Sequence, residues 1–224
     1  MELEAVKALL QLHDLLRGIP AYQPKNLAAT DIDILLQRYK TLRPQQRVLL
    51  LKAARSEPGV KHCSLPGVFK VKAAADGGPK MLAGVASSTN LDLDSERFAT
   101  TALEDMTAIR GSSAMLAHSY KVPEDILGVI TDATVGKIRN GSALNVTIKI
   151  AESNPRAVGV WQLVAEGVRI GLSVGVIVLQ SNPIDLPDGR RATEIVRCLP
   201  IEISAVAIPA NFDDAWITSA KSRR

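Results

Sequence analysis

Residues 171–175 read Gly-Leu-Ser-Val-Gly, and an apolar run, Val-Ile-Val-Leu, follows at 176–179. Glycine on both sides of Ser173 lets backbone approach closely and leaves little bulk around the hydroxyl. The apolar run predicts a buried strand. The pentapeptide also fits the G-x-S-x-G nucleophile elbow, in which a serine begins covalent catalysis. The alternative is a strand of small side chains with no chemical role.

A serine needs a base to take its proton, and histidine is the usual base near neutral pH. The three histidines, His13, His62 and His118, all precede Ser173. The serine–acid–histidine order of the α/β-hydrolases therefore cannot be assembled, which argues against an esterase of that fold. Two orders in which histidine precedes serine stay open, His-Asp-Ser as in chymotrypsin and Asp-His-Ser as in subtilisin.

His118 is the best-placed base, because it ends the short apolar segment at 113–118 just before a loop at 121–123. A histidine there can reach a neighbouring strand, although a surface histidine at a loop mouth fits the same pattern. His62 lies beside Cys63, and this pair with a distant Cys198 is too few ligands for zinc. We therefore expect no metal and no cofactor.

The candidate acid is Glu202, a lone carboxylate in the apolar run at 199–211. A carboxylate in the middle of a strand needs water or a partner. A solvated outer face is the alternative, and Asp132 is the next candidate for orienting His118.

Composition describes one domain of ordinary size with an aliphatic core. The chain has 224 residues, 46% of them hydrophobic and only 4% aromatic, with a net charge of +4. This charge is too small to indicate nucleic-acid binding. Two distant cysteines suit a reducing compartment, and no segment reads as a signal peptide or a membrane span, so we expect an intracellular protein.

The element pattern predicts an α+β fold, a mostly antiparallel β-barrel wrapped by helices, with an N-terminal helical extension. We divide the chain into a helical extension and linker at 1–66, the barrel at 67–211, and a short C-terminal helix or tail at 212–224. The expected elements are helices at 1–17, from 31, from 44 and at 96–109 and 155–166, and strands at 68–72, 82–87, 113–118, 126–135, 143–150, 169–180, 192–198 and 201–208.

Four segments in this order resemble the prohead (capsid maturation) serine protease family of tailed phages, which is similar in fold to the herpesvirus assemblins. The segments are Leu-Ala-Gly-Val-Ala-Ser at 82–87, Ala-His at 117–118, Gly-Leu-Ser-Val-Gly at 171–175 and Ile-Glu-Ile-Ser-Ala-Val-Ala-Ile-Pro-Ala-Asn at 201–211. The resemblance implies Ser173 as nucleophile, His118 as base and Glu202 as the third catalytic residue. In the herpesvirus relatives the third catalytic residue is a second histidine, and this chain has no histidine at that position.

The resemblance also implies the biology. We expect a serine endopeptidase that cuts scaffold or major capsid protein segments, and itself, inside the immature capsid in the host cytoplasm. Exposed sites for self-cleavage would be the connector at 57–80 and the tail after Asn211. Homo-oligomers are expected, and nucleic acid and membranes are not. The alternative function is a catalytically inactive capsid or scaffold assembly protein that retains the fold.

Overall fold

The computed structural model describes residues 33, 37, 39–41, 78–92, 94–119 and 121–222. Two α-helices and two short 3₁₀ turns accompany eight strands in the stretch from residue 78 onward. They are, in chain order, β1 (Lys80–Ser88), β2 (Glu96–Phe98), α4 (Thr100–Met106), η1 (Thr107–Ile109), β3 (Ser113–Leu116), η2 (Pro123–Asp125), β4 (Ile126–Ile138), β5 (Gly141–Ile150), α5 (Pro155–Ala165), β6 (Gly171–Asp185), β7 (Arg191–Val206) and β8 (Ile217–Ser222).

The strands form one mixed sheet in the order β2-β7-β3-β4-β5-β1-β8, with β6 paired to β7 off this path. β6 and β7 are antiparallel, whereas β2 and β3 run parallel to β7. Gly171 of β6 makes an isolated bridge to Trp216, just before β8, but this bridge does not extend into a ladder. The sheet is therefore not closed: the fold is α+β, and the expected antiparallel barrel is not shown.

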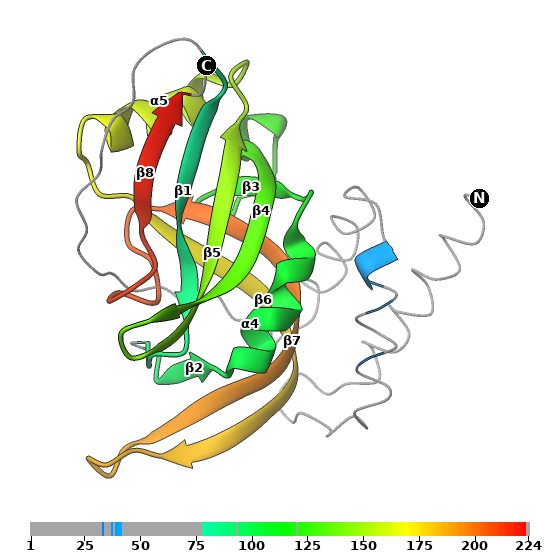
Figure 1. The fold of residues 1–224 in the computed structure, drawn as a ribbon, viewed down its shortest axis with the longest axis vertical. Coiled ribbons are helices and arrows are strands. Elements are labelled where there is room, and N and C mark those ends of the chain that lie inside the picture. Colours follow the sequence, from blue (N-terminus) through cyan, green and yellow to red (C-terminus); the bar gives the residue numbers. More distant parts are fainter. Residues whose placement is uncertain are drawn as a thin grey trace.

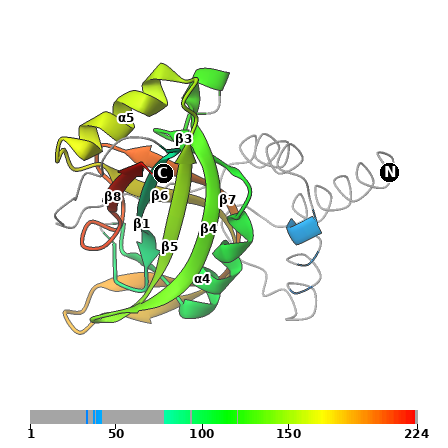
Figure 2. The same ribbon diagram turned by 45° about the horizontal axis from the view of Figure 1, so that its top comes forward.

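β6 and β7 form a long hairpin that crosses the other strands and projects beyond them (Figure 1). α4 packs against β7, and α5 lies near the opposite end of the molecule, where it contacts β8 and β4 (Figure 2). The hairpin thus contributes its inner part to the body of the molecule, and this part carries the candidate site residues.

Alternation along β6 and β7 decides which side chains enter the core. Leu172, Val174 and Val176 of β6 are buried in the hydrophobic cluster, as are Ile203 and Ala205 of β7. Because strand side chains alternate between the two faces, the residues between them point to the other face of the sheet. That face carries Ser173, Gly175, Glu202 and Ser204.

Three local predictions are confirmed. β4 and β5 form the predicted hairpin, with Ile138 opposite Gly141, so that its two turn residues, Arg139 and Asn140, lie one position before the expected Asn140-Gly141. The side chain of Asn154 caps α5 by accepting the N–H of Arg156. Gly167 then ends this region with a positive φ of 92°, a conformation that glycine adopts readily.

The structure corrects the prediction of a helix over 96–109. Residues Glu96–Phe98 form β2, because they pair with β7 from Thr193 to Ile195, and the helix begins only at Thr100. A three-residue strand has too little pattern to be separated from the helix that follows it.

Two further predictions at the C-terminal end are wrong. The strands expected at 192–198 and 201–208 are one strand, β7, because a register shift beside Pro200 accommodates a residue that has no N–H. The helix or exposed tail expected after Asn211 contains strand β8, which pairs with β1.

Several predictions lie outside the described residues. These are the helices at 1–17 and from 44, most of the connector at 57–80, and the positions of His13, His62 and Cys63. Within the expected second helix, residues 33, 37 and 39–41 are helical. The division into segments at residues 66 and 211 stays a prediction.

Candidate active site

The structure brings two of the three predicted site residues into direct contact. His118 Nδ1 lies 2.6 Å from Glu202 Oε1. The Glu202 side chain is 1% exposed and that of His118 is 16% exposed. A buried carboxylate this close to an imidazole fixes the orientation of the ring.

Ser173 lies on β6, the strand next to the one that carries Glu202, and on the same face of the sheet as Glu202. β7 runs between β6 and β3, and Ser204 of β7 is opposite Ser173 on one side and Met115 on the other. Side chains directly opposite in such a pair have Cβ atoms about 5 Å apart. Ser173 is 2% exposed. Ser173 and the His118–Glu202 pair therefore meet the same short stretch of β7, residues 202–204.

Gly175 makes room for the acid. It is opposite Glu202 in the β6–β7 ladder, and a Cβ added to it would lie 2.7 Å from Glu202 Oε1 and 3.1 Å from its Cγ. Real Cβ atoms essentially never come that close to another heavy atom, so any larger residue would displace the carboxylate.

Gly171, the other glycine beside Ser173, serves a different neighbour. A Cβ there would lie 2.2 Å from the ring of Pro209. The two glycines of the pentapeptide are therefore required by close packing, one under Pro209 and one under Glu202. The sequence pattern predicts close approach of backbone around the Ser173 hydroxyl, whereas the atoms that approach these two glycines belong to side chains.

His118 lies on an unusual piece of backbone. β3 ends at Leu116, and the next two residues, Ala117 and His118, have φ values of 50° and 55°. The left-handed conformation costs about 1–2 kcal/mol for a residue with a side chain. Strained backbone of this kind is common at functional sites, where neighbouring contacts must hold it.

The loop that follows His118 is tied to α5. The Ser119 hydroxyl donates to Asp125 Oδ2 at 2.5 Å, and Arg156 Nη1 lies 2.5 Å from Asp125 Oδ1. These contacts, the Ser119 hydrogen bond first, hold the pKa of Asp125 below its ordinary value. His118 is thus followed directly by an anchored residue.

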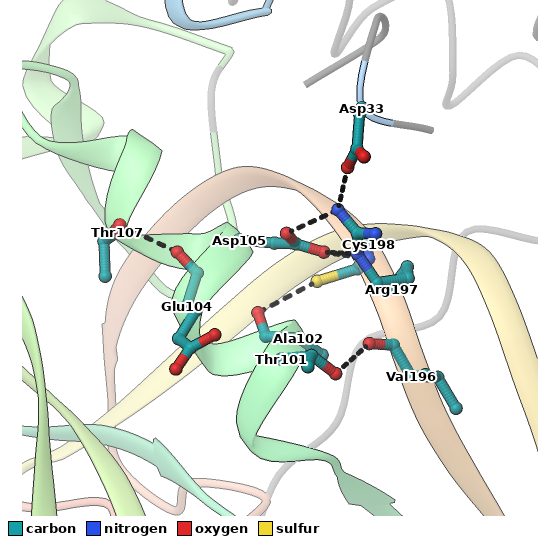
Figure 3. Close-up of polar contacts among 9 residues, drawn as sticks. All are labelled: Asp33, Thr101, Ala102, Glu104, Asp105, Thr107, Val196, Arg197 and Cys198. Atoms are coloured by element: carbon teal, nitrogen blue, oxygen red, sulfur yellow. Dashed lines mark hydrogen bonds and ion pairs between the residues drawn. The ribbon is translucent and has the colours of Figure 1, made fainter. Parts of the chain in front are cut away.

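β7 itself is anchored on the α4 side. Arg197 Nε lies 2.9 Å from Asp105 Oδ2, and its Nη2 lies 3.2 Å from Oδ1 of the same carboxylate and 3.0 Å from Oδ1 of Asp33 (Figure 3). Asp105 Oδ2 also accepts the N–H of Cys198 at 3.2 Å. Closer to Glu202, the hydroxyl of Tyr39 donates to the carbonyl of Pro200.

A pocket reaches β6 beside the serine. It lies between the end of β1, β2 and the 210–211 segment, and its lining residues are Ala86, Ser87, Asn90, Asp92, Glu96, Arg97, Phe98, Leu172, Ser173, Val174, Ala210 and Asn211. Burial raises the pKa of Asp92 to about 6. Ser173 thus borders this small pocket on one side.

Asp132, the second candidate for the acid, lies far from His118. β3 pairs with β4 so that Met115 is opposite Ile126, and Asp132 lies six residues farther along β4. At about 3.3 Å per residue this is about 20 Å. Asp132 instead pairs with Thr147. The acid that contacts His118 is Glu202.

Sequence reasoning missed Ser204. Its hydroxyl donates to Glu202 Oε2 and accepts the N–H of His118 at 3.1 Å. The signal was present as the second polar residue, two positions after Glu202, on the same face of the apolar run at 199–208.

No cluster of three or more His, Cys, Asp or Glu side chains suited to a metal ion occurs among the residues described. Within that same part of the chain, no helix is both long and apolar enough to cross a membrane.

No protein-family model matches the sequence, and a search of curated proteins finds no match. Among solved structures, the bacteriophage T4 capsid assembly protease, gp21, is similar over 67% of this chain and 94% of that one, with 12% sequence identity and a TM-score of 0.38. At this TM-score the likeness carries no argument about the site.

Proposed function

We propose that this chain is a serine endopeptidase in which Ser173 is the nucleophile, His118 the general base and Glu202 the residue that orients the base. The observation that supports this most strongly is the 2.6 Å contact between His118 Nδ1 and Glu202 Oε1, on the face of β7 that Ser173 also borders. This is the acid–histidine half of a serine triad, beside a buried serine.

In the proposed reaction, the Ser173 oxygen bonds to a peptide carbonyl carbon while its proton passes to His118. Because Nδ1 contacts Glu202, the proton goes to the other ring nitrogen, Nε2, which is itself buried. His118 then returns the proton to the leaving amine as the C–N bond breaks. Water, deprotonated by the same imidazole, then bonds to the acyl carbon, the bond from that carbon to the Ser173 oxygen breaks, and His118 returns the proton to this oxygen.

We propose scaffold segments and segments of the major capsid protein as substrates, and the enzyme itself, acting as a homo-oligomer inside an immature phage-like capsid. This part rests on the resemblance of the four sequence segments to prohead proteases. Because β8 is part of the sheet, cleavage after Asn211 would remove a paired strand, so we favour the 57–80 connector for self-cleavage.

The test is to incubate the full chain with capsid and scaffold proteins and to identify new termini by mass spectrometry. Wild type should generate them, whereas Ser173→Ala and His118→Ala should not. Ser181→Ala, at a half-buried position eight residues farther along the same strand, should behave as wild type. Termini that persist in Ser173→Ala would overturn the proposal, and a wild type with no cleavage would favour an inactive assembly protein.

A further inference from the structure

Ser204 occupies the centre of the candidate site without being one of the three predicted catalytic residues. It is fully buried on β7, opposite Ser173 of β6 and Met115 of β3. Its hydroxyl is hydrogen-bonded in both directions, to Glu202 Oε2 as donor and to the N–H of His118 as acceptor. One hydroxyl thus joins the acid to the backbone of the base.

The backbone of His118 depends on this hydroxyl. Three successive amides follow the end of β3. The first, of Ala117, donates to the carbonyl of Ala205 at 2.9 Å, and the third, of Ser119, donates to that of Leu116 at 2.9 Å. The middle amide, of His118, donates to Ser204 Oγ. This hydrogen bond holds a residue whose left-handed φ of 55° is unfavourable.

The carboxylate of Glu202 depends on it as well. Its Oε1 contacts His118 Nδ1, and its Oε2 accepts the Ser204 hydroxyl. Removal of a donor from a buried carboxylate oxygen costs more than an ordinary hydrogen bond, because the oxygen loses its partner without gaining water. The group would then rotate toward another donor, away from the imidazole.

We infer that Ser204 is a positioning residue that sets the orientation of the His118 imidazole by holding both the Glu202 carboxylate and the His118 amide. As a statement about catalysis, this rests on the proposed function. As a statement about the geometry of the His118–Glu202 pair, it stands without it.

The first measurement is the proton NMR signal of His118 Nδ1–H in protein labelled with ¹⁵N-histidine. A hydrogen bond to a carboxylate moves this signal downfield, and its absence in Glu202→Gln and His118→Ala assigns it among the three histidines. We expect Ser204→Ala to lose the signal or shift it strongly upfield. Ser204→Cys, which keeps a hydrogen-bonding group at this position but is larger and a weaker donor, should give an intermediate result if Ser204→Ala does not fold.

Ser88→Ala is a closely matched control. Ser88 is also fully buried and donates to a carboxylate, Asp214 Oδ2, at 2.6 Å. It accepts the backbone N–H of Asn90 at 3.1 Å and, unlike Ser204, also a side-chain N–H, from Asn211 at 2.8 Å. Its replacement should destabilise the protein by a similar amount and leave the His118 signal in place. An unchanged His118 signal in both Ser204 variants would overturn the inference.

The second measurement is the rate at which a fluorophosphonate labels Ser173 as a function of pH. Ser204→Ala should slow labelling by about tenfold to a hundredfold, the effect of a lost hydrogen bond to a charged group, and should change the shape of the pH profile. Ser88→Ala should keep the wild-type shape. If the reagent does not label wild type but replacement of Ser204 still changes the His118 signal, the proposed function is wrong and the positioning role of Ser204 stands.

Discussion

At the scale of single residues, the position of the Glu202 carboxylate depends on how closely β6 approaches it. Gly175 is the residue that permits this approach, because a single added carbon would lie 2.7 Å from Glu202 Oε1. Gly175 therefore determines where the Glu202 carboxylate can lie, although it has no functional group of its own.

Gly175→Ala should displace Glu202 and with it His118. Misplacement of a catalytic group by about 1 Å can cost about a hundredfold in rate, so we expect a loss of that size in labelling of Ser173. Overpacking should also lower the free energy of unfolding by about 1–3 kcal/mol, measured by urea denaturation.

Gly159→Ala is the matched control, since Gly159 lies in α5 and a Cβ there meets nothing within 4 Å. It should stabilise the protein by about 0.5–1 kcal/mol and leave labelling unchanged. Normal labelling in Gly175→Ala would show that the carboxylate is not held where the geometry puts it.

Asp92, in the wall of the pocket, gives a pH-dependent prediction. Its pKa in the folded protein is about 6, against a reference of 3.8, chiefly because of burial. A raised pKa means that the folded state binds the proton more tightly than the unfolded state. The resulting stabilisation is present below about pH 4 and is lost as the pH rises through about 6.

Asp92→Asn keeps an oxygen that can accept the N–H of Glu96 and removes the ionisation. The full shift is equivalent to about 3 kcal/mol, and solvent screening of this part-exposed group reduces it to about 1–2 kcal/mol. Urea denaturation from pH 4 to pH 8 should show the variant gaining that much relative to wild type. Glu104→Gln, at an exposed position, should follow wild type, and parallel curves for Asp92→Asn would contradict the raised pKa.

At the scale of elements, the interaction between α4 and β7 holds the strand that carries Glu202. Arg197 is the link, because it binds the buried Asp105 of α4 at 2.9 Å and the exposed Asp33 at 3.0 Å. The two carboxylates differ in burial, 8% against 69% exposed, and this difference decides their energetic weight.

Arg197→Met should leave Asp105 as a buried charge with a lost partner and lower the free energy of unfolding by about 3 kcal/mol. Asp33→Asn should change it by less than about 1 kcal/mol, because an exposed ion pair is well solvated. Thermal and urea denaturation of both variants would measure this. Equal effects would mean that the Asp33 contact matters as much to β7 as the buried one does.

At the scale of the whole molecule, the structural features that were predicted correctly from the sequence are the local ones. The β4–β5 hairpin signalled by Asn140-Gly141, the Asn154 cap of α5 and the buried first part of β6 each depend on a few neighbouring residues. The pairing of His118 with Glu202 was predicted through a resemblance of segments, and the structure has these two side chains in contact.

The rest depends on contacts between distant residues. β2 is a strand only because it lies beside β7, and β7 continues past Pro200 only because a register shift absorbs the missing N–H. Ser204 acquires its role from His118, 86 positions earlier in the chain. Pattern along the chain carries no direct information about such pairings, and the same reason explains why sheet closure was expected and is not shown.

The central claim is that His118 activates Ser173, and the most direct measurement is the rate of covalent labelling of Ser173 by a fluorophosphonate in the full-length protein, with the modified peptide identified by mass spectrometry. Loss of a general base costs about 10²–10⁴-fold. We therefore expect wild type to be labelled at Ser173, His118→Ala to be slower by about that factor, Glu202→Gln to be slowed less, and Ser181→Ala to match wild type. Labelling of Ser173 at the same rate in wild type and His118→Ala would contradict the claim.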